Sequence, residues 1–186
     1  MKAEIEKAVE VLKNGGVILY PTDTIWGLGC DPTNDRAIEK LLAIKKRAAN
    51  KSLILLVHNE ALLQRYAKTI PDVCYDLIDF AVKPLTIVYP DGQHVSDYVL
   101  GPDKSVAIRI TKDPFCVQLI QKLKAGLVST SANISNQPYS NNLADIDEEI
   151  KNRVDYIVDL PLQDKSGHAS QIIKIGADGQ VTIIRK

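Results

Sequence analysis

The sequence predicts an α/β domain in which a mixed, open β-sheet is flanked by helices. Segments with apolar residues at helical spacing alternate along the chain with short apolar runs of strand length. Hydrophobic residues make up 45% of the 186 residues and charged residues 25%, as in ordinary globular proteins. Because no repeat, low-complexity tract or linker interrupts this pattern, we expect a single domain over residues 1–186.

The helices are predicted from apolar residues three and four positions apart, together with residues that start or stop helices. In the first helix Ile5 and Leu12 fall on one face, and Gly15 follows as a stop signal. Asn34 is a good N-cap for the second helix, whose last turn would carry Lys45, Lys46 and Arg47. The predicted helices cover residues 3–13, 34–47, 60–68, 72–80, 114–124 and 145–152.

The strands are predicted from short apolar runs that are bounded by Gly, Pro or polar residues. In the run 106–110, Val106 and Ile108 share one face and leave Ala107 and Arg109 on the other. Arg109 is therefore either solvated or directed into a cleft toward a carboxylate. The predicted strands cover residues 17–20, 53–57, 85–89, 106–110, 126–130, 156–159, 171–175 and 181–184.

Charge and cysteine content narrow the possible functions. Lys plus Arg and Asp plus Glu each number 23, so the net charge is zero, and any basic site must be local. The three cysteines are far apart, which favours reduced thiols over a zinc site or a disulfide framework. No run approaches the roughly 20 apolar residues of a membrane-spanning helix. We expect a soluble, cytoplasmic protein with no membrane partner.

The first polar segment of interest is Pro-Thr-Asp-Thr-Ile-Trp-Gly-Leu-Gly at residues 21–29, directly after the first strand. In an extended chain Thr22 and Thr24 point to the same side, where their hydroxyls can bind a small polar ligand. The alternative is that these hydroxyls satisfy nearby backbone groups. Gly27 and Gly29 permit a tight turn or a close backbone approach.

A second polar segment, residues 129–135, follows the strand 126–130. Ser129, Ser131 and Asn133 share one face if the chain stays extended. Ligand sites of open α/β sheets form at the carboxyl ends of strands, so we expect the two polar segments to share one site. The alternative is a loop whose Ser and Asn side chains build turns.

A local cluster of cations lies at residues 45–51, with no acidic residue between Glu39 and Glu60. Such a cluster can hold a polyphosphate, because Arg47 offers a planar fork and each lysine a point charge. The alternative is that these cations complement the negative end of the helix dipole, which explains Lys51 less well. The chain has no P-loop motif and its histidines lack metal spacing, so no metal site is predicted. Its chemistry must rest on positioning and electrostatics.

Taken together, these segments closely resemble the YrdC-like family, and the resemblance covers nearly the whole chain. The matching segments, in order, are residues 21–29, Lys45-x-Arg47 with Lys51, Lys83-Pro84-Leu85-Thr86, Ser131-Ala132-Asn133 and the segment around Ser170. The resemblance implies a twisted open sheet around a large concave, positively charged cavity. It also implies a threonylcarbamoyl-AMP synthase, which converts L-threonine, bicarbonate and ATP to threonylcarbamoyl-AMP and pyrophosphate for threonylcarbamoyladenosine in tRNA.

The resemblance further implies roles for single residues, with Arg109 on the threonine carboxylate. The catalytic residues would be Lys45, Arg47, Ser131 and Asn133. The threonine-binding residues would be Thr24, Arg109 and Ser129. The ATP-binding residues would be Lys45, Arg47, Lys51, Ser105, Ser131, Asn133 and Ser170. Thr22 is either a ligand contact or structural. Because two anions must meet in the reaction, cationic side chains and Mg²⁺ are expected to neutralise charge.

Alternatives in other classes stay open. The same resemblance allows an RNA-binding module for double-stranded RNA or tRNA, although zero net charge weighs against tight nonspecific binding. It also allows a YciO-type paralogue with the same fold and little synthase activity, or a carbamoyl-transfer domain. Expected partners beyond the substrates are tRNA and tRNA-modification proteins.

Overall fold

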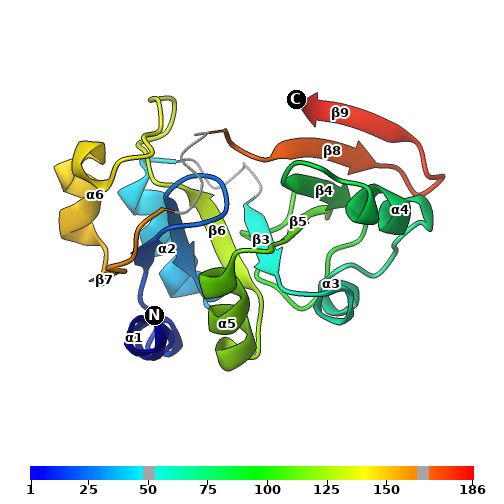
Figure 1. Ribbon diagram of the computed structural model, residues 1–186. Helices are drawn as coiled ribbons and strands as arrows, with labels where there is room; N and C mark the ends of the chain where they lie inside the picture. The colour runs from blue at the N-terminus through cyan, green and yellow to red at the C-terminus, as the bar shows by residue number, and fades with distance from the viewer. Residues whose placement is uncertain (48–52, 163–167) are drawn as a thin grey trace.

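The computed structural model of the chain describes residues 1–47, 53–162 and 168–186. These residues fold around a nine-stranded mixed β-sheet (Figure 1). The strand order is β7-β1-β2-β6-β3-β5-β4-β8-β9. The pairs β1–β7, β3–β5 and β4–β8 are parallel and the other neighbours antiparallel. Helices lie on both sides of the sheet. The predicted α/β class with a mixed open sheet is confirmed.

The elements follow the predicted order, with one strand, β2, that the sequence analysis missed. The strands are β1 (Ile18–Tyr20), β2 (Gly27–Cys30), β3 (Ile54–Val57), β4 (Leu85–Tyr89), β5 (Val106–Ile110), β6 (Leu127–Ser131), β7 (Tyr156–Ile157), β8 (Gln171–Ile175) and β9 (Val181–Arg185). The helices are α1 (Lys2–Lys13), α2 (Asp35–Ile44), α3 (Glu60–Tyr66), α4 (Val73–Asp79), α5 (Pro114–Leu123) and α6 (Glu148–Arg153), with a 3-10 turn η1 at Leu143–Asp145. Within these described residues no helix has the length and apolar character needed to cross a membrane.

The start of α2 agrees with the prediction, but its end does not. The Asn34 side chain accepts a hydrogen bond from the Ala37 amide at 3.1 Å, so it caps the helix as expected. The helix stops at Ile44, because Lys46 adopts a left-handed conformation with φ 50°. The Arg47 amide then bonds back to Leu42 O at 3.0 Å, as in a Schellman motif. The three cations at 45–47 therefore lie beyond the helix and not in its last turn.

The glycines of the first polar segment lie in strand β2 and not in a tight turn. Strand propensity disfavours glycine, which is why the strand was missed. The register pairs Gly27 with Tyr20 on one side and Gly29 with Ser129 on the other. A Cβ added to Gly29 would lie 2.8 Å from Tyr20 Cε1 and 3.0 Å from Val128 O. Of the two roles predicted for these glycines, a tight turn or a close backbone approach, the structure shows the close approach.

One face of the sheet is a continuous apolar surface. Because side chains alternate along each strand, the register places one apolar side chain from each neighbouring strand in the same row. Helices α2, α3, α4 and α6 contribute buried side chains to this core. The row across the sheet is Cys30, Val128, Leu55, Ile108, Ile87 and Ile173, and the paired residues Leu19 and Leu28 lie on the same face.

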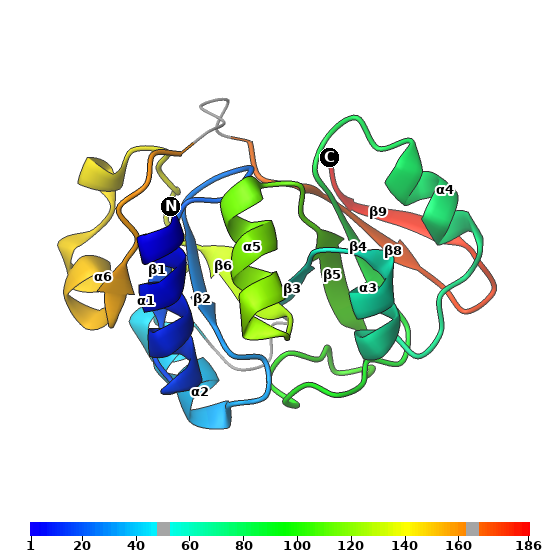
Figure 2. The same cartoon turned by 60° about the horizontal axis from the view of Figure 1, so that its bottom comes forward.

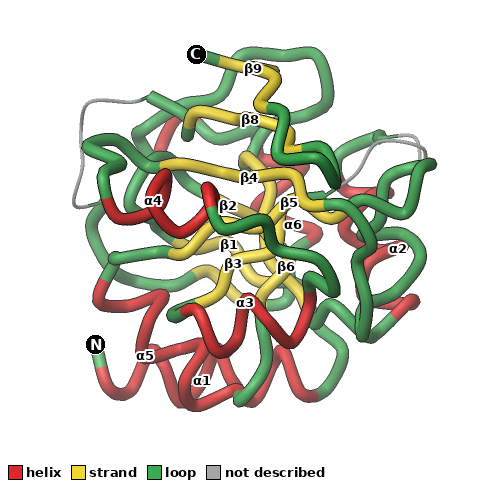
Figure 3. The backbone as a smooth tube through the Cα atoms, turned by 90° about the vertical axis from the view of Figure 1, so that its right-hand side faces the viewer, coloured by secondary structure: helices red, strands yellow, loops and turns green. Residues whose placement is uncertain are grey.

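The opposite face is covered by α1 and α5 over only part of its width. These two helices lie side by side (Figure 2), and Lys122 of α5 pairs with Glu6 of α1 at 3.1 Å. Their apolar faces pack on Tyr20 and Leu56 among others. The sheet continues past these helices to β8 and β9 (Figure 3). There the same face carries Ala107 and Arg109 beside apolar side chains such as Val88 and Ile172, and because none of the described helices covers it, a cavity forms at this place.

Gly29→Ala is predicted to lower the free energy of unfolding by roughly 1–3 kcal/mol, because the added methyl group overpacks the contact with the Tyr20 ring. Gly27→Ala is the matched control, since its methyl group would meet Thr22 Cγ2 at 3.3 Å and Ser129 Oγ at 3.4 Å, which the neighbours can accommodate. Urea denaturation followed by circular dichroism measures both. Equal losses in the two variants would show that close packing at Gly29 does not limit this strand.

Candidate active site

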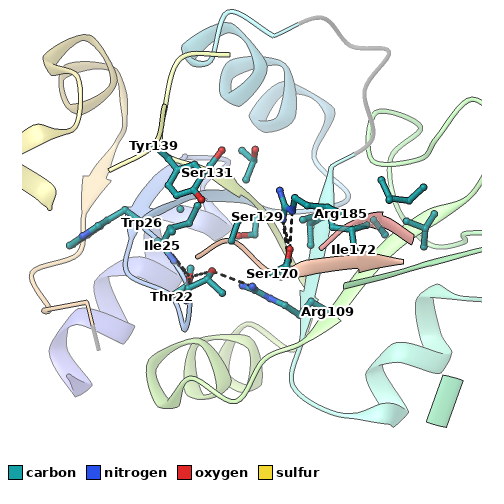
Figure 4. A pocket seen from close by; sticks show the side chains of 18 of the residues that line it. Thr22, Ile25, Trp26, Arg109, Ser129, Ser131, Tyr139, Ser170, Ile172 and Arg185 are labelled. Carbon is teal, nitrogen blue, oxygen red and sulfur yellow. Dashed lines mark hydrogen bonds between the residues drawn. The ribbon is translucent and has the colours of Figure 1, made fainter. Parts of the chain in front are cut away.

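A cavity of about 340 Å³ lies over strands β2, β6, β5, β4 and β8 (Figure 4). Its wall brings together residues as far apart along the chain as Thr22 and Arg185, and it includes residues of both polar segments, as expected. The predicted site residues on this wall are Thr24, Arg47, Arg109, Ser129, Ser131 and Ser170. Lys45, Ser105 and Asn133 lie off the wall, and Lys51 lies outside the described residues.

Thr22 and Thr24 lie on the same side, as expected, but they use their hydroxyls differently. Thr22 Oγ1 donates to Ile25 O at 2.7 Å and accepts from the amides of Thr24 and Ile25 at 3.0 and 3.2 Å. These bonds shape the loop, so the structural alternative holds for Thr22. Thr24 Oγ1 accepts from Arg109 Nη1 at 3.2 Å. The loop thus presents the Thr24 hydroxyl to the cavity.

Arg109 is a buried cation in the floor of the cavity, and its side chain is 5% exposed. Its Nη2 pairs with Asp23 Oδ1 at 3.0 Å, and Thr111 donates to the other oxygen of Asp23 at 3.3 Å. A buried guanidinium needs such a partner, because an unpaired charge away from water is costly. The contacts with Thr24 and Asp23 use two of the five N–H donors of the guanidinium. Arg109 therefore keeps donor capacity for an anionic ligand.

Arg47 is a half-buried cation on the cavity wall beside strand β6. Its Nη1 lies 3.4 Å from Thr130 Oγ1, a long hydrogen bond, and burial lowers the pKa of its guanidinium. The chain places it there because the left-handed turn at Lys46 ends α2 next to β6. An arginine in this position offers several donors to a phosphate or carboxylate.

Lys45 is buried behind the cavity wall, and its side chain holds the loop after β6. Its Nζ donates to Asn133 O at 2.7 Å, to Asn133 Oδ1 at 3.2 Å and to Ser131 O. Its own carbonyl accepts from the Ser135 amide at 2.9 Å. Burial, with a smaller contribution from the positive charge of Arg47, lowers the pKa of Lys45 to about 7.

Ser131 and Asn133 are joined by a hydrogen bond at the end of β6. Ser131 Oγ donates to Asn133 Oδ1 at 2.6 Å, and Asn133 Nδ2 donates to Gln137 O at 2.5 Å. Ser131 lies on the cavity wall, whereas Asn133 lines a neighbouring hollow. Tyr139 lines both hollows. Asn133 is therefore connected to the cavity wall by its hydrogen bond with Ser131 and does not line the cavity itself.

The two remaining predicted serines have different surroundings. Ser170 is buried in the wall, with its Oγ 2.8 Å from Thr86 Oγ1. Ser105 lies off the wall, where its Oγ donates to Asp103 Oδ1 at 2.5 Å. Hydrogen bonds from Lys174 and Ser105 hold the pKa of Asp103 well below its usual range. Ser105 is buried in the turn before β5, outside the cavity wall.

Arg185 is a cavity residue that the sequence analysis missed. Its Nε and Nη2 donate to Ser170 O at 2.9 and 2.7 Å (Figure 4). Only the sheet order, which places β9 beside β8, brings this C-terminal residue to the cavity. Among the described residues that line the cavity, three are arginines and none carries a carboxylate. Such a wall suits an anionic ligand.

The low pKa of Lys45 predicts a pH dependence of stability. Because folding lowers this pKa from 10.5 to about 7, the unfolded chain binds more protons than the folded chain between these values. The contribution of Lys45 to the free energy of unfolding therefore rises with pH across this window. Lys45→Met should therefore show a smaller increase in the free energy of unfolding with pH, measured by urea denaturation at a series of pH values. Lys46→Met, which removes an exposed neighbouring lysine, should keep it. An unchanged pH profile in Lys45→Met would contradict the assignment.

Comparison with known proteins shows the same fold and sequence over most of the chain. A family model named Sua5_yciO_yrdC and described as telomere recombination matches residues 10–186. The threonylcarbamoyl-AMP synthase of Pseudoalteromonas translucida (strain TAC 125) is 37% identical over 164 residues, which are 87% of this chain and 88% of that protein.

Solved structures agree with this result. P. abyssi Sua5 complexed with L-threonine matches with a TM-score of 0.84 at 26% identity, over 91% of this chain. The match covers 50% of the Sua5 chain, so this chain spans about half of its length. E. coli YciO matches with a TM-score of 0.85 at 23% identity, over 100% of this chain and 90% of YciO, which shows the fold alone. The chain belongs to the Sua5/YciO/YrdC family.

Proposed function

We propose that this chain is a threonylcarbamoyl-AMP synthase that converts L-threonine, bicarbonate and ATP to threonylcarbamoyl-AMP and pyrophosphate. The observation that carries the proposal is the single cavity that joins buried Arg109 and Thr24 to Arg47 and Ser131. Curated relatives at 37% identity bear the name of this enzyme, and the matched P. abyssi structure holds L-threonine. The product would serve tRNA-modification proteins that form threonylcarbamoyladenosine, in the cytoplasm.

The reaction needs charge neutralisation more than a nucleophile with its base. The threonine amine adds to carbon dioxide derived from bicarbonate and loses a proton, which leaves an N-carboxylate. An oxygen of this group attacks the α-phosphorus of ATP, and the bond from that phosphorus to pyrophosphate breaks. Because both reactants are anions, cations fixed in a cavity lower the barrier by stabilising the charge as they meet.

Threonine is proposed to bind at the floor of the cavity. The Arg109 guanidinium supplies a charge-assisted hydrogen bond to the substrate carboxylate, while Asp23 and Thr24 hold its orientation. Thr24 and Ser129 supply hydroxyls for the polar groups of threonine. A site built to hydrogen-bond the substrate hydroxyl rejects analogues that lack it.

ATP is proposed to bind along the wall formed by Arg47, Ser131, Ser170 and Arg185. Arg47 and Arg185 would face the phosphates, and Lys51 would assist from the segment after Arg47. Lys45 and Asn133 would act from behind, because their hydrogen bonds fix the main chain of the Ser131 loop.

Magnesium is proposed to enter with the nucleotide. Across residues 1–47, 53–162 and 168–186, no group of three or more His, Cys, Asp or Glu side chains could hold a metal ion. Asp23, the carboxylate in contact with the floor, is paired with Arg109. These residues do not fit a magnesium site built by the protein, so we assign no step to one. On the phosphates of ATP, Mg²⁺ would neutralise part of their charge.

Purified protein should release pyrophosphate only when ATP, Mg²⁺, bicarbonate and threonine are all present. Arg47→Ala should lose about 1.5–3 kcal/mol of transition-state stabilisation if its contact is charge-assisted, seen as a lower kcat/KM for ATP. Arg36→Ala, an exposed arginine of α2 away from the cavity wall, is the matched control.

Two outcomes would contradict this proposal. Normal pyrophosphate release by Arg47→Ala removes Arg47 from the site. No threonine-dependent release by the wild type, together with strong and steeply salt-dependent tRNA binding, favours an RNA-binding module instead.

A further inference from the structure

Tyr20 is a fully buried side chain whose hydroxyl reaches the cavity wall. It lies at the end of β1, is 0% exposed, and donates a hydrogen bond to Ser129 Oγ at 2.7 Å. Ser129 belongs to β6, and strand β2 lies between β1 and β6. The tyrosine therefore acts across a whole strand to reach a residue of the proposed threonine site.

The two glycines of β2 make this reach possible. Gly27 pairs with Tyr20, and Gly29 pairs with Ser129, so both glycines lie on the sheet face that carries the ring and the serine. A Cβ at Gly29 would lie 2.8 Å from Tyr20 Cε1, and one at Gly27 would lie 3.4 Å from both Tyr20 Cε1 and Ser129 Oγ. The Gly-Leu-Gly segment thus clears a side-chain-free path for the aromatic ring.

The direction of the hydrogen bond decides what Ser129 can do. A serine hydroxyl has one proton to donate and two lone pairs to accept. Since Tyr20 donates, Ser129 uses a lone pair here and keeps its own proton. In the described parts of the chain, that proton has no acceptor. Burial raises the pKa of Tyr20 well above its usual value, so the phenol keeps the proton that it donates to Ser129.

We propose that Tyr20 is a positioning residue of the synthase: it holds Ser129 Oγ as an acceptor, so that the Ser129 proton faces an anionic oxygen of the threonine substrate. The oxygen belongs to the carboxylate or the N-carboxylate, both of which accept hydrogen bonds and donate none. Without the phenol, the hydroxyl of Ser129 can rotate and donate its hydrogen bond to a protein group instead of the substrate. This inference rests on the proposed function.

Tyr20→Phe tests the idea because it removes only the hydroxyl. The KM for threonine should rise roughly 3- to 10-fold, the size of one lost hydrogen bond, with a smaller change in the KM for ATP. Ser129→Ala should raise the threonine KM as well. If Tyr20 acts through Ser129, then Tyr20→Phe added to Ser129→Ala should change the threonine KM no further.

Tyr66→Phe is the matched control for a purely structural effect. Tyr66 is 1% exposed, and its hydroxyl accepts from the Gly126 amide at 2.8 Å, away from the cavity wall. This variant should lose stability in thermal unfolding and keep both KM values. An unchanged threonine KM in Tyr20→Phe overturns the proposal. So does an equal rise from Tyr20→Phe in the wild-type and Ser129→Ala backgrounds, because the tyrosine would then not act through the serine.

Calorimetric titration of the free protein with L-threonine separates this inference from the proposed function. A wild type that binds threonine without releasing pyrophosphate contradicts the synthase activity. In that case weaker threonine binding by Tyr20→Phe than by Tyr66→Phe still supports the positioning role, and equal binding overturns it. A wild type that does not bind threonine overturns both.

Discussion

The burial of the Arg109 charge is the constraint on which the site depends. Strand alternation places Arg109 on the face opposite the apolar core, over a part of the sheet that α1 and α5 leave uncovered. Its guanidinium is withdrawn from water and must be balanced, which Asp23 does at 3.0 Å. The Thr22 hydroxyl shapes the loop after β1 that carries Asp23 by bonding to the main chain of Thr24 and Ile25. One buried cation thus links β5 to the loop between β1 and β2.

A second buried cation, Lys45, organises the other side of the cavity, but with partners of a different kind. Its ammonium donates to carbonyl and amide oxygens of the loop after β6, and among the described residues it pairs with no carboxylate. The charged form is therefore less well stabilised, and burial lowers its pKa to about 7. Arg109 holds a loop by a salt bridge, whereas Lys45 holds a loop by neutral acceptors. Both place small hydroxyl groups at the cavity wall.

Much of this arrangement can be predicted from local sequence pattern. The alternation of side chains along β5 predicts that Arg109 lies on the sheet face opposite Val106 and Ile108. The position of the two polar segments at strand ends predicts that they line one site. The strand at Gly27–Cys30 was not predicted, because glycine has a low strand propensity. The glycines are needed there because the Tyr20 ring passes close to them on its way to Ser129, a contact between distant residues that local sequence does not reveal. The place of Arg185 at the cavity was not predicted either, because local sequence does not indicate which strands become neighbours in the sheet.

The most direct measurement of the central claim is a crystal structure of the protein soaked with L-threonine. Our account predicts that the substrate carboxylate lies within hydrogen-bond distance of the Arg109 guanidinium, with the Thr24 and Ser129 hydroxyls around the amino acid. Threonine bound elsewhere on the molecule, or bound in the cavity with its carboxylate turned away from Arg109, would contradict the account.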